Sequence, residues 1–328
     1  MRWCLLAAVV FGLSISDVAS QAQGPPDGQR LSLSRSTSQD AGFFATTGVV
    51  RFQLIQGRLC LDPPRHRKGS QSRDQDGVYE SITVTAERGI PSLHYVCQTE
   101  SQHLILSVQQ AGYVRIESYF PRTAHRSVLD QPEIGPVTWK VVRGDLDEEY
   151  HGATLLHLRQ SNPVTFDEHY GLLMQRLLRG QSMEELCGQT QVAMLRQAGH
   201  ADSPDRQSIL AAFDQLRSSK RARRIAAERQ LISWGTPIIP IVQSIPRRDM
   251  DPEQSDRLRQ ILRRLRRPVN DTPASLAMLL VNDRNYWSLI ASRLTRDQIQ
   301  SANHHLEVAG LASIALDTGP LQRVARQR

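Results

Sequence analysis

A helix, a tight turn and a second helix are indicated between residues 224 and 242, and this stretch constrains the fold more than any other. Three apolar residues spaced i, i+4 and i+7 line one face of the first helix: Ala227, Leu231 and Trp234. Gly235 follows directly, where a residue in the left-handed region ends many helices. Pro237 can open the next helix, because the N–H that proline lacks has no partner in a first turn. The stretch therefore predicts two helices joined by a turn.

The same pattern continues to about residue 310. First helices of successive pairs are expected near Lys220, Asp251 and Arg284, a spacing of about 32 residues. Their partner helices are expected to begin near three further residues: Pro237, Pro273 and Arg296. The first pair resembles a unit of the short HEAT-like α-solenoid repeats. The resemblance implies a helical repeat domain over residues 203–328 that binds other macromolecules, and it carries over no catalytic residue.

The preceding part of the chain predicts an antiparallel β domain over residues 43–160. Apolar and polar residues alternate in five segments, as in half-buried strands: 49–55, 82–84, 104–108, 113–116 and 137–141. Gln109 to Gly112 is expected to form a hairpin connection, and the polar stretch 62–77 a long loop. The fold class expected is therefore α+β, with a sandwich-like or curved sheet followed by an all-α repeat domain.

A helical hairpin is expected to connect the two parts, over residues 161–202. Thr165 with Glu168, and Ser182 with Glu185, have the spacing of capping boxes. The first helix would bury one apolar face: Tyr170, Leu173, Met174 and Leu177. The second would bury another: Leu186, Val192 and Leu195. The sequence leaves open whether this hairpin covers the β domain or begins the repeat domain.

The first 20 residues have the features of an export signal. Arg2 precedes a short apolar run over residues 3–15, and small residues follow at Ala19, Ser20 and Ala22. Residues 21–42, rich in Ser, Gln, Gly and Pro, predict a disordered linker. We therefore expect an exported protein, periplasmic or extracellular, with no membrane span after cleavage of the signal.

Three cysteines follow the predicted signal. Cys60 and Cys97 both fall in strand-like segments, so a disulfide between them is expected in an oxidising compartment. Cys187 would then remain a buried, unreactive thiol.

Basic residues concentrate in the predicted helical domain, where residues 218–328 contain 19 basic and 10 acidic residues. Around residues 257–267 the apolar side chains share one helix face and arginines fill the other. A plain amphipathic helix explains this pattern, and so does a basic groove for an acidic protein or an anionic envelope component. Under the second interpretation four arginines are the candidate partner-binding residues: Arg257, Arg263, Arg264 and Arg267. We do not expect nucleic acid as a partner of an exported chain.

Motifs for nucleotide hydrolysis, dinucleotide binding, zinc proteolysis and α/β-hydrolase chemistry do not occur in the sequence. The acidic run 145–149 is expected to be a solvated loop, and no cofactor or metal is predicted. The leading hypothesis is a non-enzymatic scaffold or adaptor. One alternative is a hydrolase with its site in the β domain, for which His66, Asp147 and His151 are the nominated residues. The other alternative is a structural component of the cell envelope.

Overall fold

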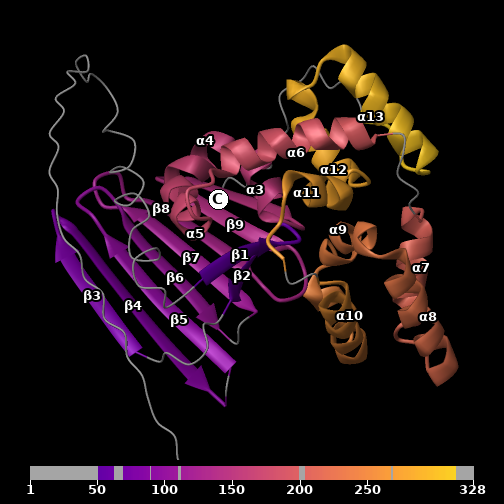
Figure 1. Ribbon diagram of the computed structural model, residues 1–328, viewed down its shortest axis with the longest axis horizontal. Helices are drawn as coiled ribbons and strands as arrows, with labels where there is room; N and C mark the ends of the chain where they lie inside the picture. Colours follow the sequence, from indigo (N-terminus) through magenta and orange to yellow (C-terminus); the bar gives the residue numbers. More distant parts are fainter. Residues whose placement is uncertain are drawn as a thin grey trace, which may run out of the picture.

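An antiparallel sheet followed by a helical region makes up the protein in the computed structural model (Figure 1). The structure describes residues 51–62, 69–88, 90–109, 112–198, 204–266 and 269–314. The predicted export signal and linker lie outside the described residues. The mixed α+β class expected from the sequence is confirmed.

The main sheet is a meander of eight strands, each paired antiparallel with its neighbour in sequence. In order they are β3 (Gly69–Gln75), β4 (Val78–Glu87), β5 (Ile90–Gln98), β6 (His103–Gln109), β7 (Tyr113–Phe120), β8 (His125–Gln131), β9 (Val137–Arg143) and β10 (Leu146–Gly152). A separate two-stranded ribbon precedes it, formed by β1 (Arg51–Ile55) and β2 (Arg58–Asp62). The alternation that predicted β6 is borne out, because Leu104, Leu106 and Val108 are all buried.

Two predicted loops are strands at the edges of this sheet. Residues 69–75, expected within a loop, form β3 and pair with β4. The acidic run 145–149 was also expected to be a loop, but Leu146–Gly152 is β10, paired with β9. Both are outermost strands, so each is hydrogen-bonded on one side only. Every residue of β3 is exposed, and the alternation that marks a half-buried strand is therefore missing.

Short helices cover one face of the sheet near β8 and β9: α3 (Leu155–Ser161), α4 (Pro163–Phe166), the π-helical turn η1 (Asp167–Gly171) and α5 (Leu172–Leu177). The predicted apolar face from Tyr170 to Leu177 is buried. Tyr170 packs edge-on against Trp139 of β9, and both side chains hydrogen-bond Ser127 (2.6 and 2.7 Å). This first helical segment therefore packs on the sheet. It begins after Asn162, whose side chain caps it, and not at Thr165.

The remaining helices form the right-hand part of Figure 1. They are α6 (Met183–Gln197), α7 (Arg206–Gln215), α8 (Arg221–Trp234), η2 (Thr236–Ile238), α9 (Ile239–Gln243), η3 (Arg247–Asp249), α10 (Pro252–Leu265), α11 (Pro273–Leu280), α12 (Arg284–Ile290), η4 (Ala291–Arg293) and α13 (Arg296–Val308). The turn predicted at Gly235 is present, with φ of 73°, and Ala227 and Leu231 are buried. Ser182 caps α6, but Val192 is exposed, because the buried stripe runs through Leu186, Cys187, Thr190 and Met194.

The helices do not pack in simple sequence order. Helix α6 packs against α11, while α10 lies against α8. In a solenoid each repeat contacts only its neighbours, and the contacts between α6 and α11 differ from that pattern. Buried apolar side chains from the ribbon, the sheet and the helices join in one core. This packing does not establish the HEAT-like repeat arrangement. None of the described helices is long and apolar enough to cross a membrane.

Candidate functional site

The arginines nominated from the sequence are not equally free to bind a partner. Arg257 is only 19% exposed, because it pairs with Glu253 (2.6 Å) and with Glu228 of the neighbouring α8 (3.4 Å). Arg264 also pairs with Glu228 (3.0 Å), but 62% of its side chain is exposed. Arg263 is 65% exposed and pairs with Glu133 of the loop after β8 (3.1 Å). Arg267 lies outside the described residues. Arg263 and Arg264 therefore remain available to a partner, whereas Arg257 is used inside the protein.

A pocket that the sequence did not reveal lies between the β1–β2 ribbon, the loop after β8 and helix α10. We call it the basic pocket, and its volume is about 220 Å³. Four of its lining residues are basic: Arg58, Arg259, Arg263 and Arg266. Glu133 is the only acidic residue among the described residues that line it. The basic pocket thus carries an excess of positive charge.

Polar side chains hold the ribbon in place to form one wall of this pocket. The amide of Gln131, at the end of β8, accepts from the N–H of Leu59 (2.9 Å) and donates to its carbonyl (2.8 Å). On the other side, the Asp271 carboxylate accepts from the N–H of Gly57 (2.7 Å). Gly57 has φ of 71°, and a Cβ there would approach the Cβ of Thr154 to 2.6 Å. The ribbon turn therefore fits closely between the sheet and the helical region.

Arg58 is the most buried charge in the pocket, with 6% of the residue exposed. Its guanidinium donates to three backbone carbonyls, those of Pro132 (2.6 Å), Gly135 (3.0 Å) and Ala153 (3.1 Å). Burial lowers the pKa of Arg58 to about 10, and the nearby Cys60 opposes this shift. Arg58 therefore stays charged at neutral pH. No carboxylate in the described part of the chain forms an ion pair with it.

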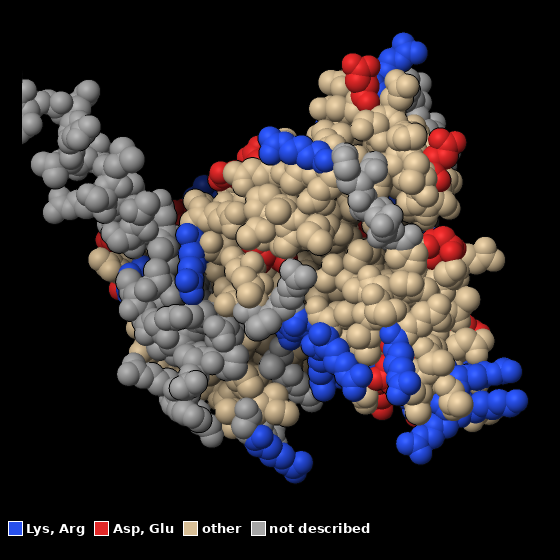
Figure 2. Space-filling view, turned by 45° about the vertical axis from the view of Figure 1, so that its right-hand side comes forward, with Lys and Arg blue, Asp and Glu red and all other residues tan. Residues whose placement is uncertain are grey.

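The other arginines of the pocket differ in their partners. Glu133 accepts from Arg259 (2.8 Å) and Arg263 (3.1 Å), so one carboxylate serves two guanidinium groups. Arg266 is exposed and approaches the Cys60 thiol, and within the described ranges it has no ion pair. Figure 2 shows basic side chains gathered at the lower end of the molecule, in the region of α8 and α10. Arg58 and Arg266 are thus two charges for which the described part of the chain provides no ion-pair partner.

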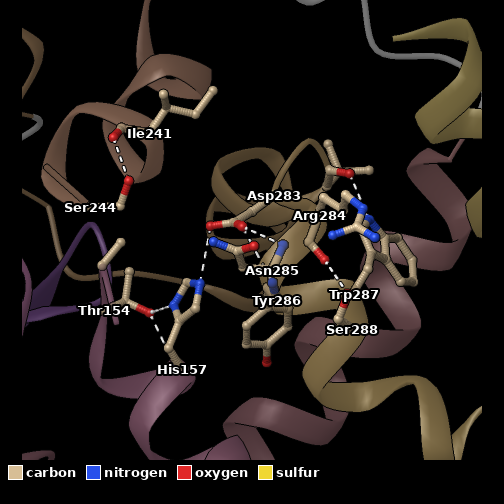
Figure 3. Close-up of polar contacts among 12 residues, drawn as sticks. Thr154, His157, Ile241, Ser244, Asp283, Arg284, Asn285, Tyr286, Trp287 and Ser288 are labelled. Carbon is tan, nitrogen blue, oxygen red and sulfur yellow. Dashed lines mark hydrogen bonds and ion pairs between the residues drawn. The ribbon is translucent and has the colours of Figure 1, made fainter. Parts of the chain in front are cut away.

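A second cavity, of about 380 Å³, lies between α3, α9 and α12. His157 lies in its wall and is held from both sides (Figure 3). Its Nε2 is 3.0 Å from a carboxylate oxygen of Asp283, and its Nδ1 is 2.9 Å from the Thr154 hydroxyl. A hydroxyl, an imidazole and a carboxylate in series invite comparison with a catalytic triad. Thr154, however, is 1% exposed, caps helix α3 and does not line the cavity. The arrangement is therefore a structural link between α3 and α12.

Of the three residues nominated for a hydrolase, the two that the structure describes are not brought together in one cavity. His66 lies outside the described residues. Asp147 and His151 are both on β10, and His151 lies 3.4 Å from Glu149 on the same strand. His151 lines the second cavity, whereas Asp147 does not. Among the described residues, no three His, Cys, Asp or Glu side chains gather closely enough to hold a metal ion.

The three cysteines of the described part are free thiols, so the expected Cys60–Cys97 bridge is not formed. Cys60 lies on β2 of the ribbon, beside Arg58 and Arg266. Cys97 is buried on β5 of the main sheet, where its sulfur lies 3.8 Å from Arg176. The two thiols thus belong to different sheets and have different neighbours. Burial raises the pKa of Cys187 to about 11, which keeps this thiol protonated.

We expect peptide mapping to recover Cys60 and Cys97 as separately alkylated residues when the protein is purified without reductant and alkylated during denaturation. In the native protein Cys60 should be alkylated before Cys97 and Cys187, because it is only partly buried and the other two are buried. A fully reduced sample is the control and should give the same map. A linked Cys60–Cys97 peptide pair would contradict the arrangement described above.

Comparisons with known proteins give no family for the chain. No protein-family model matches it, and neither the curated proteins nor the solved structures contain a significant match. The basic pocket and the charges around it are therefore the features from which a function can be inferred.

Proposed function

We propose that the protein is an exported, non-enzymatic interaction protein that binds an acidic protein partner through its helical region. In this proposal the helices of residues 203–328 present a surface as HEAT-like repeats do, and chemistry on a substrate is not required. The observation that carries it is the pair of arginines, Arg58 and Arg266, that line the basic pocket and form no ion pair with any described carboxylate. Periplasmic or extracellular location is part of the proposal, and it follows from the predicted export signal.

The proposed contact surface consists of three exposed arginines at the C-terminal end of α10, which we call the arginine surface: Arg263, Arg264 and Arg266. Arg221 and Arg223 at the start of α8 are also exposed, but Arg224 in the same turn pairs with Glu253 (3.5 Å), so they lie toward the start of α10 and apart from the arginine surface. Charges of one sign on one face speed the approach of an oppositely charged partner and make affinity sensitive to salt. An acidic protein fits both features.

Neutralising the arginine surface is expected to weaken partner binding about tenfold or more at low salt, because several exposed charges act together. The variant carries Arg263→Gln, Arg264→Gln and Arg266→Gln in the full-length chain. It should fold normally, because Arg259 still pairs with Glu133 and Arg257 still pairs with Glu228. The measurement is capture of partners from an envelope extract of the source cells at low and moderate salt, quantified by mass spectrometry.

A matched variant removes the same charge elsewhere, with Arg122→Gln, Arg196→Gln and Arg248→Gln. These three arginines are exposed and do not line the basic pocket. Partners of the arginine surface should be retained by the matched variant and lost by the first. Equal capture by the wild type and both variants, with the same salt dependence, would refute the proposed function.

A further inference from the structure

The basic pocket has an apolar neighbour on the other side of the ribbon turn. This second pocket, of about 250 Å³, lies between the ribbon turn and helix α11 and includes the apolar side chains of Val269, Met278 and Leu279. Ile55 and Gln56 line both pockets, so the two adjoin across the tip of the ribbon. The side chain of Gln56 donates to the carbonyl of Leu265 (2.9 Å) and so fixes this tip against the end of α10.

Exposed apolar side chains mark the second pocket as a place for an apolar group. Val269 is 65% exposed and Met278 is 48% exposed, although both are large hydrophobic residues. Isolated hydrophobic side chains on a surface need no explanation, but here they lie in one concave wall. Asp271 is the acidic residue in this wall among those described. A chain of phosphates that crossed both pockets would be repelled by the Asp271 carboxylate. An uncharged side chain in the second pocket would not be repelled.

The basic pocket, in contrast, is suited to a single carboxylate. Arg58 is fixed by its three carbonyl partners, so its guanidinium does not have to be ordered when a ligand binds. Arg266 lies on the same pocket wall and is exposed, so it can close on an anion from the rim. Guanidinium groups bind carboxylates through paired, charge-assisted hydrogen bonds.

We infer that these two pockets together recognise a short acidic segment of a partner protein, taking one carboxylate side chain at Arg58 and Arg266 and a neighbouring apolar side chain beside Val269 and Met278. The inference rests on the proposed function and specifies which part of the partner protein is recognised. The arginine surface steers the partner toward this site, and the two pockets select the segment.

Four fluorescently labelled peptides in one Gly/Ser frame test the inference: one with glutamate next to leucine, one with glutamine for the glutamate, one with serine for the leucine, and one with both changes. Binding to the full-length protein is measured by fluorescence anisotropy at moderate salt. The first peptide should bind best, and each single change should weaken binding about tenfold, as expected for one charge-assisted hydrogen-bond pair or one buried apolar side chain.

Variants on the exposed rim assign each effect to its pocket. Arg266→Ala should remove the preference for glutamate over glutamine and keep the preference for leucine. Met278→Ser should remove the preference for leucine over serine and keep the preference for glutamate over glutamine. Arg248→Ala, at an arginine that is 86% exposed and outside the basic pocket, is the matched control and should change neither preference.

Equal binding of the four peptides would overturn the inference, and so would a glutamate preference that survives Arg266→Ala. A tighter complex with a phosphoserine–leucine peptide than with the glutamate–leucine peptide would overturn the choice of carboxylate. The proposed function fails separately, if neutralising the arginine surface leaves capture of the partner intact. Loss of capture combined with equal peptide binding would remove the two-pocket site and leave the arginine surface standing.

Discussion

Asp283→Ala is expected to lower the free energy of unfolding by about 2–4 kcal/mol at pH 7, because it leaves the buried His157 imidazole without a hydrogen-bond partner and removes the cap of α12. The Asp283 side chain accepts three hydrogen bonds. One oxygen accepts from His157 at 3.0 Å, and the other caps α12 by accepting from the N–H groups of Asn285 (2.9 Å) and Tyr286 (3.2 Å). Alanine leaves the His157 imidazole, which is 3% exposed, without that partner. Urea unfolding followed by circular dichroism measures the loss.

Asp205→Ala is the matched control for this prediction. Asp205 also caps a helix, α7, by accepting from the N–H of Ser208 (3.0 Å), but it has no histidine partner and is exposed. Asp205→Ala should lower the free energy of unfolding much less than Asp283→Ala does. The difference between the two losses measures the contribution of the buried contact between Asp283 and His157. Asp283→Asn keeps a capping oxygen and should fall between the two. Equal losses for Asp205→Ala and Asp283→Ala would show that the pair with His157 contributes nothing beyond the cap.

Acid should reduce the effect of the Asp283 substitution. Burial by itself raises the pKa of Asp283, but His157 and the backbone donors outweigh it and hold that pKa below its ordinary value of 3.8. The unfolded carboxyl therefore binds its proton at a higher pH than the folded one does. The stability that Asp283 contributes is complete above about pH 4 and is lost as the pH falls through the folded pKa. The wild type and the alanine variant should converge below that range.

The strands and helices that carry a strong periodic pattern could be predicted from the sequence. Alternation revealed β6 and β7, and the glycine at position 235 revealed the turn after α8. The edge strands β3 and β10 could not be found in this way. Their stability comes from one hydrogen-bonded neighbour, and neither strand has a buried side chain: β3 is exposed throughout, and β10 is at most half-buried.

The basic pocket could not be predicted, because its geometry is made by distant parts of the chain. The carbonyls that accept from Arg58 belong to residues 74 to 95 positions away in the sequence. No sequence motif indicates which backbone carbonyls a buried arginine will contact. The arginine-rich face of α10 was visible in the sequence, but its partners were not. Glu228 lies on α8 and Glu133 in the loop after β8, and only the packing places them opposite Arg257 and Arg263. Periodicity shows which helix face is polar, and it does not show which charges are already paired.

His169→Asn is expected to make the protein less sensitive to acid than the wild type. His169 lies in the π-helical turn η1, with 1% of its surface exposed, and its Nδ1 hydrogen-bonds the Ser118 hydroxyl (2.9 Å). Its ring packs against that of Phe120, and its Nε2 has no hydrogen-bond partner among the described atoms. Burial, together with the charges of Arg143 and His125, lowers the pKa of His169 from 6.5 to about 4. The folded protein therefore holds this imidazole neutral at pH 5, while the unfolded chain protonates it.

The sign of the effect follows from proton linkage. Between pH 6.5 and 4 the unfolded state binds a proton that the folded state does not, so the wild type loses stability as the pH falls, by up to about 2–3 kcal/mol for this one group. Asp271 acts in the opposite direction, because burial raises its pKa to about 6, but it is present in both proteins and cancels in their difference. Urea unfolding at pH 7 and pH 4.5 should show a larger loss for the wild type than for His169→Asn. Parallel losses would mean that the imidazole takes up its proton without leaving its buried place, which requires a partner for Nε2 that the packing around η1 does not provide.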